Sequence, residues 1–163
     1  MEAPVREALA ATGSSATVLD LARNEGWFSH RMLEWGASRV VGVDIRPRLI
    51  HRAELLRDHF GISPERLQLR CADIFSLDAS EFGSFDVVLC LGLIYHLEDP
   101  IGAIRIAHAL TKNVCAIESQ LTRQNDPVVH GWGASDQYKE TSASFAARFE
   151  AGHESNLLAS AGV

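Results

Sequence analysis

Residues 17–45 have the sequence TVLDLARNEGWFSHRMLEWGASRVVGVDI. A short apolar strand ends at Asp20, a tight loop follows over residues 22–26, an amphipathic helix continues to Gly36, and a second apolar strand ends at Asp44. This order of strand, loop, helix and strand predicts a right-handed βαβ unit, in which the loop and both acids lie at one end of a parallel sheet. Nucleoside cofactors bind at that end of such sheets.

The loop distinguishes between two classes of nucleoside cofactor. A dinucleotide needs a glycine-rich loop whose backbone N–H groups and helix dipole hold a pyrophosphate. This loop lacks the pattern GxGxxG, and Glu25 is expected to bring a negative charge toward such an anion. A cationic adenosyl ligand without phosphate is compatible with acids before and beside the loop, so the sequence favours that class.

Strand and helix patterns alternate along the chain as far as Gln120. Segments rich in apolar or β-branched residues predict further strands at residues 39–43, 85–91 and 114–118, and another strand is expected at residues 67–71. A helix is expected over residues 47–60, where apolar residues recur on one face and Gly61 follows, and another helix is expected to begin at the Asp99-Pro100 pair. Alternating strands and helices of this kind indicate an α/β sheet.

Composition indicates an ordinary globular domain. The chain has 163 residues, 47% of them apolar, and a net charge of −6, which argues mildly against wrapping nucleic acid by charge alone. The three cysteines have no metal-ligand spacing and are expected to pack as small apolar side chains. Neither a secretory signal nor an apolar run of about 20 residues is visible, so no membrane partner and a cytoplasmic location are expected.

From about Ala16 to Gln120 the chain resembles the class I S-adenosylmethionine-dependent methyltransferases. Their first loop has the consensus D-x-G-x-G-x-G, which aligns with residues 20–26 and retains only the last glycine here. The other two glycines are replaced by Ala22, a mild change, and by Asn24, the non-glycine residue best suited to left-handed backbone.

Arg23 is the largest departure of this loop from the consensus, because small residues are usual at that position. Its side chain either pairs with the carboxylate of the cofactor or lies outward along the flank of the helix. The second interpretation is favoured, because arginine often lays its stem over apolar surface.

The resemblance implies S-adenosylmethionine as the cofactor. In the family, the acid that ends the second strand accepts hydrogen bonds from the ribose hydroxyls, and Asp44 matches that position. Asp73 matches the acid that receives the adenine amino group. Either acid alone would more often be a turn residue that caps the next helix, but two acids at one sheet edge favour the ligand role. The implied cofactor-binding residues are Asp20, Ala22, Asn24, Gly26, Asp44, Ile45, Asp73, Ile74 and Leu91.

The run G-x-x-Y-H-x-x-x-P at residues 92–100 is similar to one branch of the family, which includes tRNA wobble-uridine modifiers. This loop borders the transferable methyl group in the family, so Tyr95 and His96 are the implied catalytic residues on the acceptor side. A histidine has a pKa suited to deprotonating an acceptor. The alternative interpretation, which is equally well supported, is that His96 only forms a hydrogen bond with the loop backbone and that Tyr95 only lines the wall of the site. A metal site of His96, Glu98 and Asp99 is disfavoured, because the helix cap uses Asp99 and the spacing matches no familiar ligand set.

The resemblance implies a doubly wound, mostly parallel Rossmann-like sheet of order 3-2-1-4-5 in a single domain spanning residues 1–163, with its core at residues 16–120. Residues 121–139 are expected to form a long loop, and residues 141–151 a helix. In the loop, His130, Trp132 and Tyr138 either form an acceptor lid or pack against the sheet edge.

The residues after 120 are too few for the further helix and the antiparallel strand pair that usually follow strand five. The chain is therefore expected to be truncated at its C-terminus and to lack the final antiparallel strands. Strand five is then expected to have an unpaired edge unless residues 121–163 fold back over it.

The implied function is methyl transfer from S-adenosylmethionine to an acceptor that the sequence does not identify, most often a small molecule. Three alternatives remain open: a tRNA wobble-uridine-type modification enzyme, a degenerate non-catalytic domain of the same fold, and a nucleotide-dependent oxidoreductase. The sequence does not indicate an oligomeric state.

Overall fold

A computed structural model describes residues 2–121, 141–148 and 156–160. In chain order its elements are α1 (Glu2–Thr12), η1 (Gly13–Ser15), β1 (Thr17–Leu21), α2 (Trp27–Glu34), β2 (Arg39–Asp44), α3 (Pro47–His59), β3 (Leu67–Cys71), η2 (Ile74–Ser76), α4 (Ala79–Phe82), β4 (Phe85–Leu91), η3 (Ile94–His96), α5 (Pro100–Ala109), β5 (Thr111–Leu121), β6 (Thr141–Arg148) and β7 (Asn156–Ser160).

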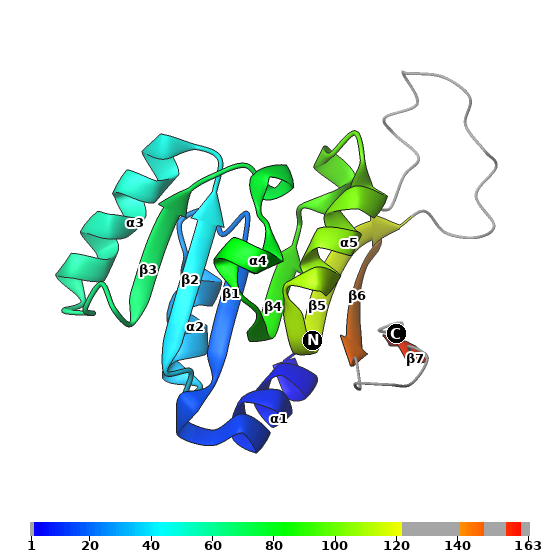
Figure 1. The fold of residues 1–163 in the computed structure, drawn as a ribbon, viewed down its shortest axis with the longest axis horizontal. Helices are drawn as coiled ribbons and strands as arrows, with labels where there is room; N and C mark the ends of the chain where they lie inside the picture. Colours follow the sequence, from blue (N-terminus) through cyan, green and yellow to red (C-terminus); the bar gives the residue numbers. More distant parts are fainter. Residues whose placement is uncertain (1, 122–140, 149–155, 161–163) are drawn as a thin grey trace.

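The strands form one sheet in the order β3-β2-β1-β4-β5-β6-β7 (Figure 1). Strands β1 to β5 are parallel, so the expected doubly wound arrangement with the order 3-2-1-4-5 is confirmed. Leu21 at the end of β1 pairs with Val43 of β2 on one side and with Cys90 of β4 on the other. The loops that follow these three strands therefore leave the sheet at the same edge.

The sheet continues beyond β5 with two antiparallel strands, β6 and β7. The expectation that the final antiparallel strands are missing is therefore wrong, and so is the helix expected over residues 141–151. Strand β6 pairs with β5 from Leu121↔Thr141 to Val114↔Arg148. An open strand edge leaves backbone N–H and C=O groups unpaired, and β6 pairs with those of β5. The stated exception therefore applies: a segment of residues 121–163 folds back over strand five. The lid candidates His130, Trp132 and Tyr138 lie outside the described residues.

Helices cover both faces of the sheet, and α1 is an element that the sequence analysis did not identify. Val5, Ala8 and Leu9 of α1 are buried at helical spacing. They join a core cluster on one face with Met32 of α2, whereas Ala103, Ala107 and Leu110 join a second cluster with η2. Val18 and Leu19 of β1 belong to opposite clusters because neighbouring side chains on a strand alternate between faces. Within the described residues, no helix is long and apolar enough to span a bilayer.

Candidate cofactor and acceptor site

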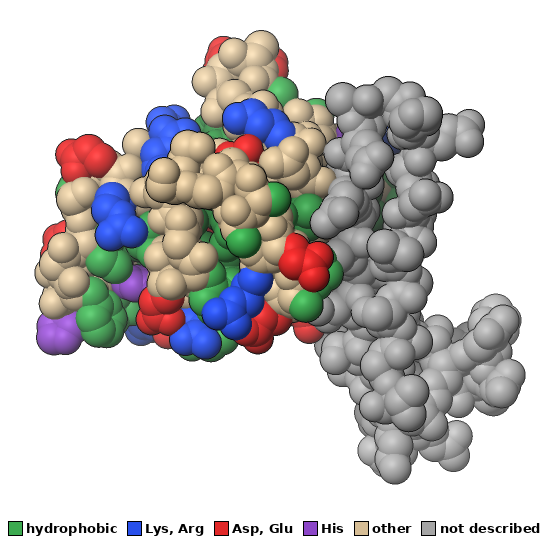
Figure 2. All heavy atoms as spheres, turned by 90° about the horizontal axis from the view of Figure 1, so that it is seen from below, with side chains coloured by type: hydrophobic (Ala, Val, Ile, Leu, Met, Phe, Trp, Pro, Cys, Tyr) green, Lys and Arg blue, Asp and Glu red, His purple; other side chains and the backbone are tan. Residues whose placement is uncertain are grey.

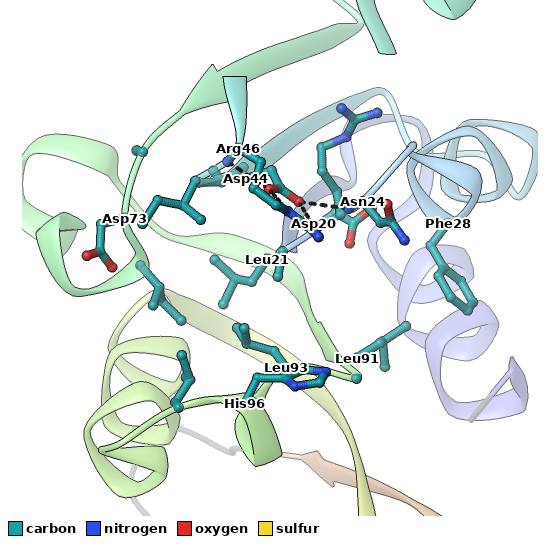
Figure 3. A pocket seen from close by; sticks show the side chains of 18 of the residues that line it. Asp20, Leu21, Asn24, Phe28, Asp44, Arg46, Asp73, Leu91, Leu93 and His96 are labelled. Atoms are coloured by element: carbon teal, nitrogen blue, oxygen red, sulfur yellow. Dashed lines mark hydrogen bonds and ion pairs between the residues drawn. The ribbon is translucent and has the colours of Figure 1, made fainter. Parts of the chain in front are cut away.

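A cavity of about 690 Å³ lies at the carboxyl ends of β1, β2, β4 and β5 (Figure 3). It is the point where the sheet order reverses from β2-β1 to β4-β5, which is where open α/β sheets bind ligands. Its lining consists of Asp20, Leu21, Ala22, Arg23, Asn24, Phe28, Val43, Asp44, Ile45, Arg46, Ala72, Asp73, Ile74, Leu91, Gly92, Leu93, Tyr95, His96, Leu97 and Glu118.

The cavity is lined by all the cofactor-binding and catalytic residues that the resemblance implied, except Gly26. It also contains Phe28, Arg46, Leu93 and Glu118, which the sequence analysis did not assign to the site. For Glu118 a signal was available, because it is an acid at the carboxyl end of a parallel strand, as Asp44 is. Phe28 and Leu93 gave no such signal, because apolar side chains in a cavity wall resemble those of the core.

The loop after β1 adopts left-handed backbone at all three positions where the family consensus has glycine. The φ angle is 53° at Ala22, 53° at Asn24 and 90° at Gly26. The two replacements therefore preserve the path of the loop, although only glycine adopts this conformation without steric cost. Gly26 is the N-cap residue of α2 and lies against the guanidinium group of Arg23 rather than in the cavity wall.

Asp20 is 2% exposed and accepts a hydrogen bond of 2.6 Å from the Ser29 hydroxyl on α2. Burial raises the pKa of Asp20 to about 6, although the Ser29 hydrogen bond and the positive charge of Arg23 act in the opposite direction. Asp20 therefore serves as a buried link between β1 and α2 at the base of the loop.

The outward orientation expected for Arg23 is wrong, because its side chain is 4% exposed. It fills the space over Gly42 of β2 and beside Gly26, where any larger residue would collide with it. Within the described part of the chain, its three guanidinium nitrogens have no hydrogen-bond partner. Burial lowers the pKa of Arg23, while the charges of Asp20 and Asp44 act to raise it. Two glycines in the neighbouring backbone make this burial possible.

Asp44 accepts four hydrogen bonds, which arrive from two loops. The backbone N–H of Asn24 donates to Oδ2 over 3.0 Å, and the backbone N–H of Arg46 donates to Oδ1 over 3.0 Å. The Arg46 guanidinium adds one bond to each oxygen, at 2.9 Å from Nε and 2.9 Å from Nη2 (Figure 3). Burial acts to raise the pKa of Asp44, but these hydrogen bonds outweigh it and hold the pKa below its usual range. Asp44 is thus ionised and bonded to both loops.

Asp73 and Asp99 both act as caps. Asp73 accepts a hydrogen bond from the backbone of Phe75 and lies in the cavity wall as well, so its capping role and a ligand role are compatible. Asp99 accepts from the backbone N–H of Gly102 and is the N-cap of α5, as expected. Among the described residues, no group of three or more histidine, cysteine or acidic side chains is arranged to hold a metal ion.

Tyr95 and His96 lie in η3, which follows β4. Their ring centroids are 4.3 Å apart, and Tyr95 is 42% exposed. Figure 3 shows His96 across the cavity from Asp44, with Leu91 and Leu93 on the same side as His96. Asp44 and Asp73 thus line the same cavity as Tyr95, His96 and Glu118.

Glu25, which was expected to face a pyrophosphate, does not line the cavity. It forms an ion pair with Arg52 of α3, with Oε1 2.8 Å from Nη1. Other charged side chains do line the cavity. These are four carboxylates, on Asp20, Asp44, Asp73 and Glu118, against the two guanidinium groups of Arg23 and Arg46. An excess of negative charge disfavours a pyrophosphate and favours a cation.

Residues 19–114 match the family model described as a methyltransferase domain. This match covers more than half of the chain, and the sheet order is that of the resemblance described above. The chain belongs to the class I S-adenosylmethionine-dependent methyltransferase family.

Known relatives of this methyltransferase domain are longer proteins. It is 34% identical over 97 residues to the ubiquinone biosynthesis O-methyltransferase of Xanthomonas campestris pv. campestris (strain B100), a match that covers 60% of the chain and 39% of the relative. The chain thus spans about two fifths of the length of that curated relative.

Among solved structures, the methyltransferase domain is similar to the N-terminal domain of EvdMO1 with S-adenosylhomocysteine (SAH) bound. The identity is 25% and the TM-score 0.61, over 77% of this chain and 53% of that one. It also shares its fold with magnesium protoporphyrin IX methyltransferase from Synechocystis PCC 6803 with bound S-adenosylmethionine, at 20% identity and a TM-score of 0.60, over 72% and 55% of the two chains.

The left-handed conformation of Ala22 leads to a first prediction. Replacing Ala22 with glycine removes the steric cost of this conformation, and we expect the free energy of unfolding to rise by about 1 kcal/mol. Asn24→Gly is the matched control and should give a smaller gain, because asparagine tolerates this backbone better. Chemical denaturation of the three proteins measures both differences. An equal or larger gain for Asn24→Gly would contradict the assignment of the cost to Ala22.

The raised pKa of Asp20 predicts a pH-dependent stability. The folded chain binds this proton more tightly than the unfolded chain, whose carboxyl has the ordinary pKa of 3.8, so Asp20 lowers stability as the pH rises from about 4 to 6. An asparagine side chain at this position would still accept the Ser29 hydrogen bond and would not ionise. We expect Asp20→Asn to exceed the parent by about 2–3 kcal/mol above pH 7 and to match it near pH 4.

The control for this prediction is Asp78→Asn. Asp78 is an exposed cap that accepts a hydrogen bond from the backbone of Ser80, which lowers the pKa of its carboxyl. Its replacement should therefore lower stability at neutral pH, the opposite sign to Asp20→Asn. Thermal unfolding of the three proteins from pH 4 to 8 tests both signs. A pH-independent difference between the parent and Asp20→Asn would show that Asp20 does not titrate in this range.

Proposed function

We propose that this chain binds S-adenosylmethionine in the cavity and transfers its methyl group to a small-molecule acceptor. The observation that carries the proposal is the position of Asp44, an ionised carboxylate at the end of β2 that lies in the same cavity as Asp73 and across it from His96. Asp44 suits the ribose hydroxyls and Asp73 suits the adenine amino group. Ile45 and Ile74 provide apolar surface for the adenine. The loop of Asp20, Ala22 and Asn24, together with Leu91, would hold the methionine part.

The charges in the cavity wall fit this cofactor. When bound, S-adenosylmethionine supplies an electrophilic methyl group on a positively charged sulfonium. The excess of carboxylates over guanidinium groups in the wall favours such a cation. The same excess disfavours an anionic acceptor, so we propose that the acceptor is neutral or cationic.

The end of the cavity at His96 is the proposed acceptor side. Its residues would align the acceptor atom and exclude water, which is the main contribution an enzyme makes to this displacement. His96 would take the proton that the acceptor loses when it gains the methyl group. Glu118, which is half-buried and for which the described residues provide no side-chain partner, is a second group able to accept a proton.

The three alternatives are less well supported. For tRNA, a continuous basic face would be expected, whereas Figure 2 shows Lys and Arg side chains interspersed with Asp and Glu on the face seen from below. Several arginines of the described residues are paired with acids, as in Arg31–Glu34 and Arg57–Asp58. For a dinucleotide-dependent oxidoreductase, the charge of the cavity is unfavourable. A degenerate domain would not bind S-adenosylmethionine, so measured binding of this cofactor distinguishes the two.

The cytoplasmic location expected from the sequence is also part of this proposal. Cys71, Cys90 and Cys115 are all free thiols in the structure. Free thiols are typical of a reducing compartment.

Calorimetric titration with S-adenosylmethionine, SAH and NAD tests the proposed cofactor. We expect the first two to bind and Asp44→Ala to weaken their binding by about 1.5–3 kcal/mol, the loss typical of hydrogen bonds to a charged acceptor. Asp78→Ala serves as a control at an exposed cap outside the cavity. Binding of NAD without binding of SAH would contradict the proposal, and unchanged binding by Asp44→Ala would contradict the ribose role.

Methyl transfer to pools of neutral, cationic and anionic small molecules and of tRNA tests the acceptor class. We expect turnover with a neutral or cationic small molecule. With that acceptor, His96→Gln should lower kcat by about 100-fold or more if His96 takes the proton that the acceptor loses. If His96→Gln retains the kcat of the parent, another group takes the proton and His96 has only a structural role in the loop.

A further inference from the structure

We infer that Arg46 competes with the ligand for Asp44, so that a ribose binds by exchanging its two hydroxyl groups for the two guanidinium bonds. This inference rests on the proposed function, because it assumes that Asp44 receives a ribose. It assigns to Arg46, a residue outside the sequence-derived site, control over the affinity for adenosyl ligands.

The Asp44 carboxylate can accept only a limited number of hydrogen bonds. Two carboxylate oxygens offer about four lone-pair positions. In the structure Asp44 already accepts four bonds, all of 2.9–3.0 Å, two from backbone N–H groups and two from the Arg46 side chain. Two further O–H donors therefore need two of these positions to be released.

The backbone donors and the guanidinium donors differ in how easily they can leave Asp44. The donors from the backbone are fixed: Asn24 lies in the left-handed loop, and Arg46 directly precedes Pro47, which confines its backbone to an extended conformation with φ −94° and ψ 107°. The Arg46 side chain is 56% exposed, whereas that of Asp44 is 1% exposed. The guanidinium can therefore rotate into solvent, while the carboxylate and both backbone donors stay in place.

The exchange leaves the number of hydrogen bonds to Asp44 unchanged. Two N–H donors leave and two O–H donors arrive, on the same two oxygens. A guanidinium fork bonded to both oxygens of a carboxylate is a strong competitor, although exposure to solvent weakens it. The parent protein thus binds a ribose less tightly than the bare carboxylate would.

Removal of the side chain tests the exchange. Arg46→Ala keeps both backbone bonds to Asp44 and deletes the two guanidinium bonds, so we expect SAH to bind about 5- to 10-fold more tightly than to the parent. Arg46→Lys keeps the charge without the planar fork and should show a smaller gain. Arg48→Ala, which removes an equal exposed charge two residues away, should leave the affinity unchanged. Thermal unfolding of each variant checks that it is folded.

A pair of nucleosides isolates the role of the hydroxyls. Adenosine must displace the guanidinium, but 2′,3′-dideoxyadenosine lacks both the 2′- and the 3′-hydroxyl and leaves the bonds between Arg46 and Asp44 intact. The Arg46→Ala variant should therefore gain affinity for adenosine by about the same 5- to 10-fold and none for the dideoxy compound. Since salt screens the half-exposed ion pair, SAH affinity should rise with NaCl in the parent and not in Arg46→Ala.

The outcomes separate this inference from the proposed function. If the parent binds SAH and Arg46→Ala binds it equally or more weakly, the exchange is wrong while the cofactor assignment stands. An equal gain for adenosine and 2′,3′-dideoxyadenosine would also overturn the exchange, since it would show a general effect of charge or space. If neither the parent nor Arg46→Ala binds any of these ligands, both the inference and the proposed function are overturned.

Discussion

The carboxylate of Asp44 is the contact on which the geometry of the site depends. It accepts one backbone hydrogen bond from the loop after β1 and another from the turn that leads into α3. Asn24 lies 20 residues before Asp44 in the sequence, and the two segments follow the neighbouring strands β1 and β2. A single ionised side chain therefore holds two walls of the cavity together, and it is the side chain to which we assign the ribose.

The region behind this contact carries an unusual amount of buried charge for a small domain. Asp20 and Arg23 are both almost completely buried, yet no ion pair joins these two described residues. Burial disfavours the charged form of each group. The opposite charge of the other group partly offsets this cost, although the two side chains do not form an ion pair. The loop is thus held by left-handed backbone and by charges that lie beneath it, a combination that sacrifices stability near a functional site.

The parts of the fold that the sequence predicted are those determined by local pattern. A nearly continuous apolar run identified β4 with its observed ends, because a strand buried on both faces carries few polar residues. The ends of β3, an edge strand that includes Gln68 and Arg70, were also predicted. The failures occurred where tertiary pairing decides. The segment Thr141–Arg148 forms a strand because the open edge of β5 provides backbone partners for it, and its own composition did not indicate that. Helix α1 was not identified because Val5, Ala8 and Leu9 form a short apolar stripe whose burial depends on the sheet above it.

For the site, the sequence by itself determined which acids lie at the carboxyl edge of the sheet, because strand order and strand ends place Asp20, Asp44 and Asp73 there. It also determined the left-handed path of the loop, since Asn24 and Gly26 tolerate that backbone. Only the tertiary structure decided which charges meet. The burial of Arg23 requires Gly42 on a neighbouring strand, and the neutralisation of Glu25 requires Arg52 on a different helix. The pairing of Arg46 with Asp44 depends on the rotamer of a long, half-exposed side chain. Such contacts join residues through space, so no pattern along one segment specifies them.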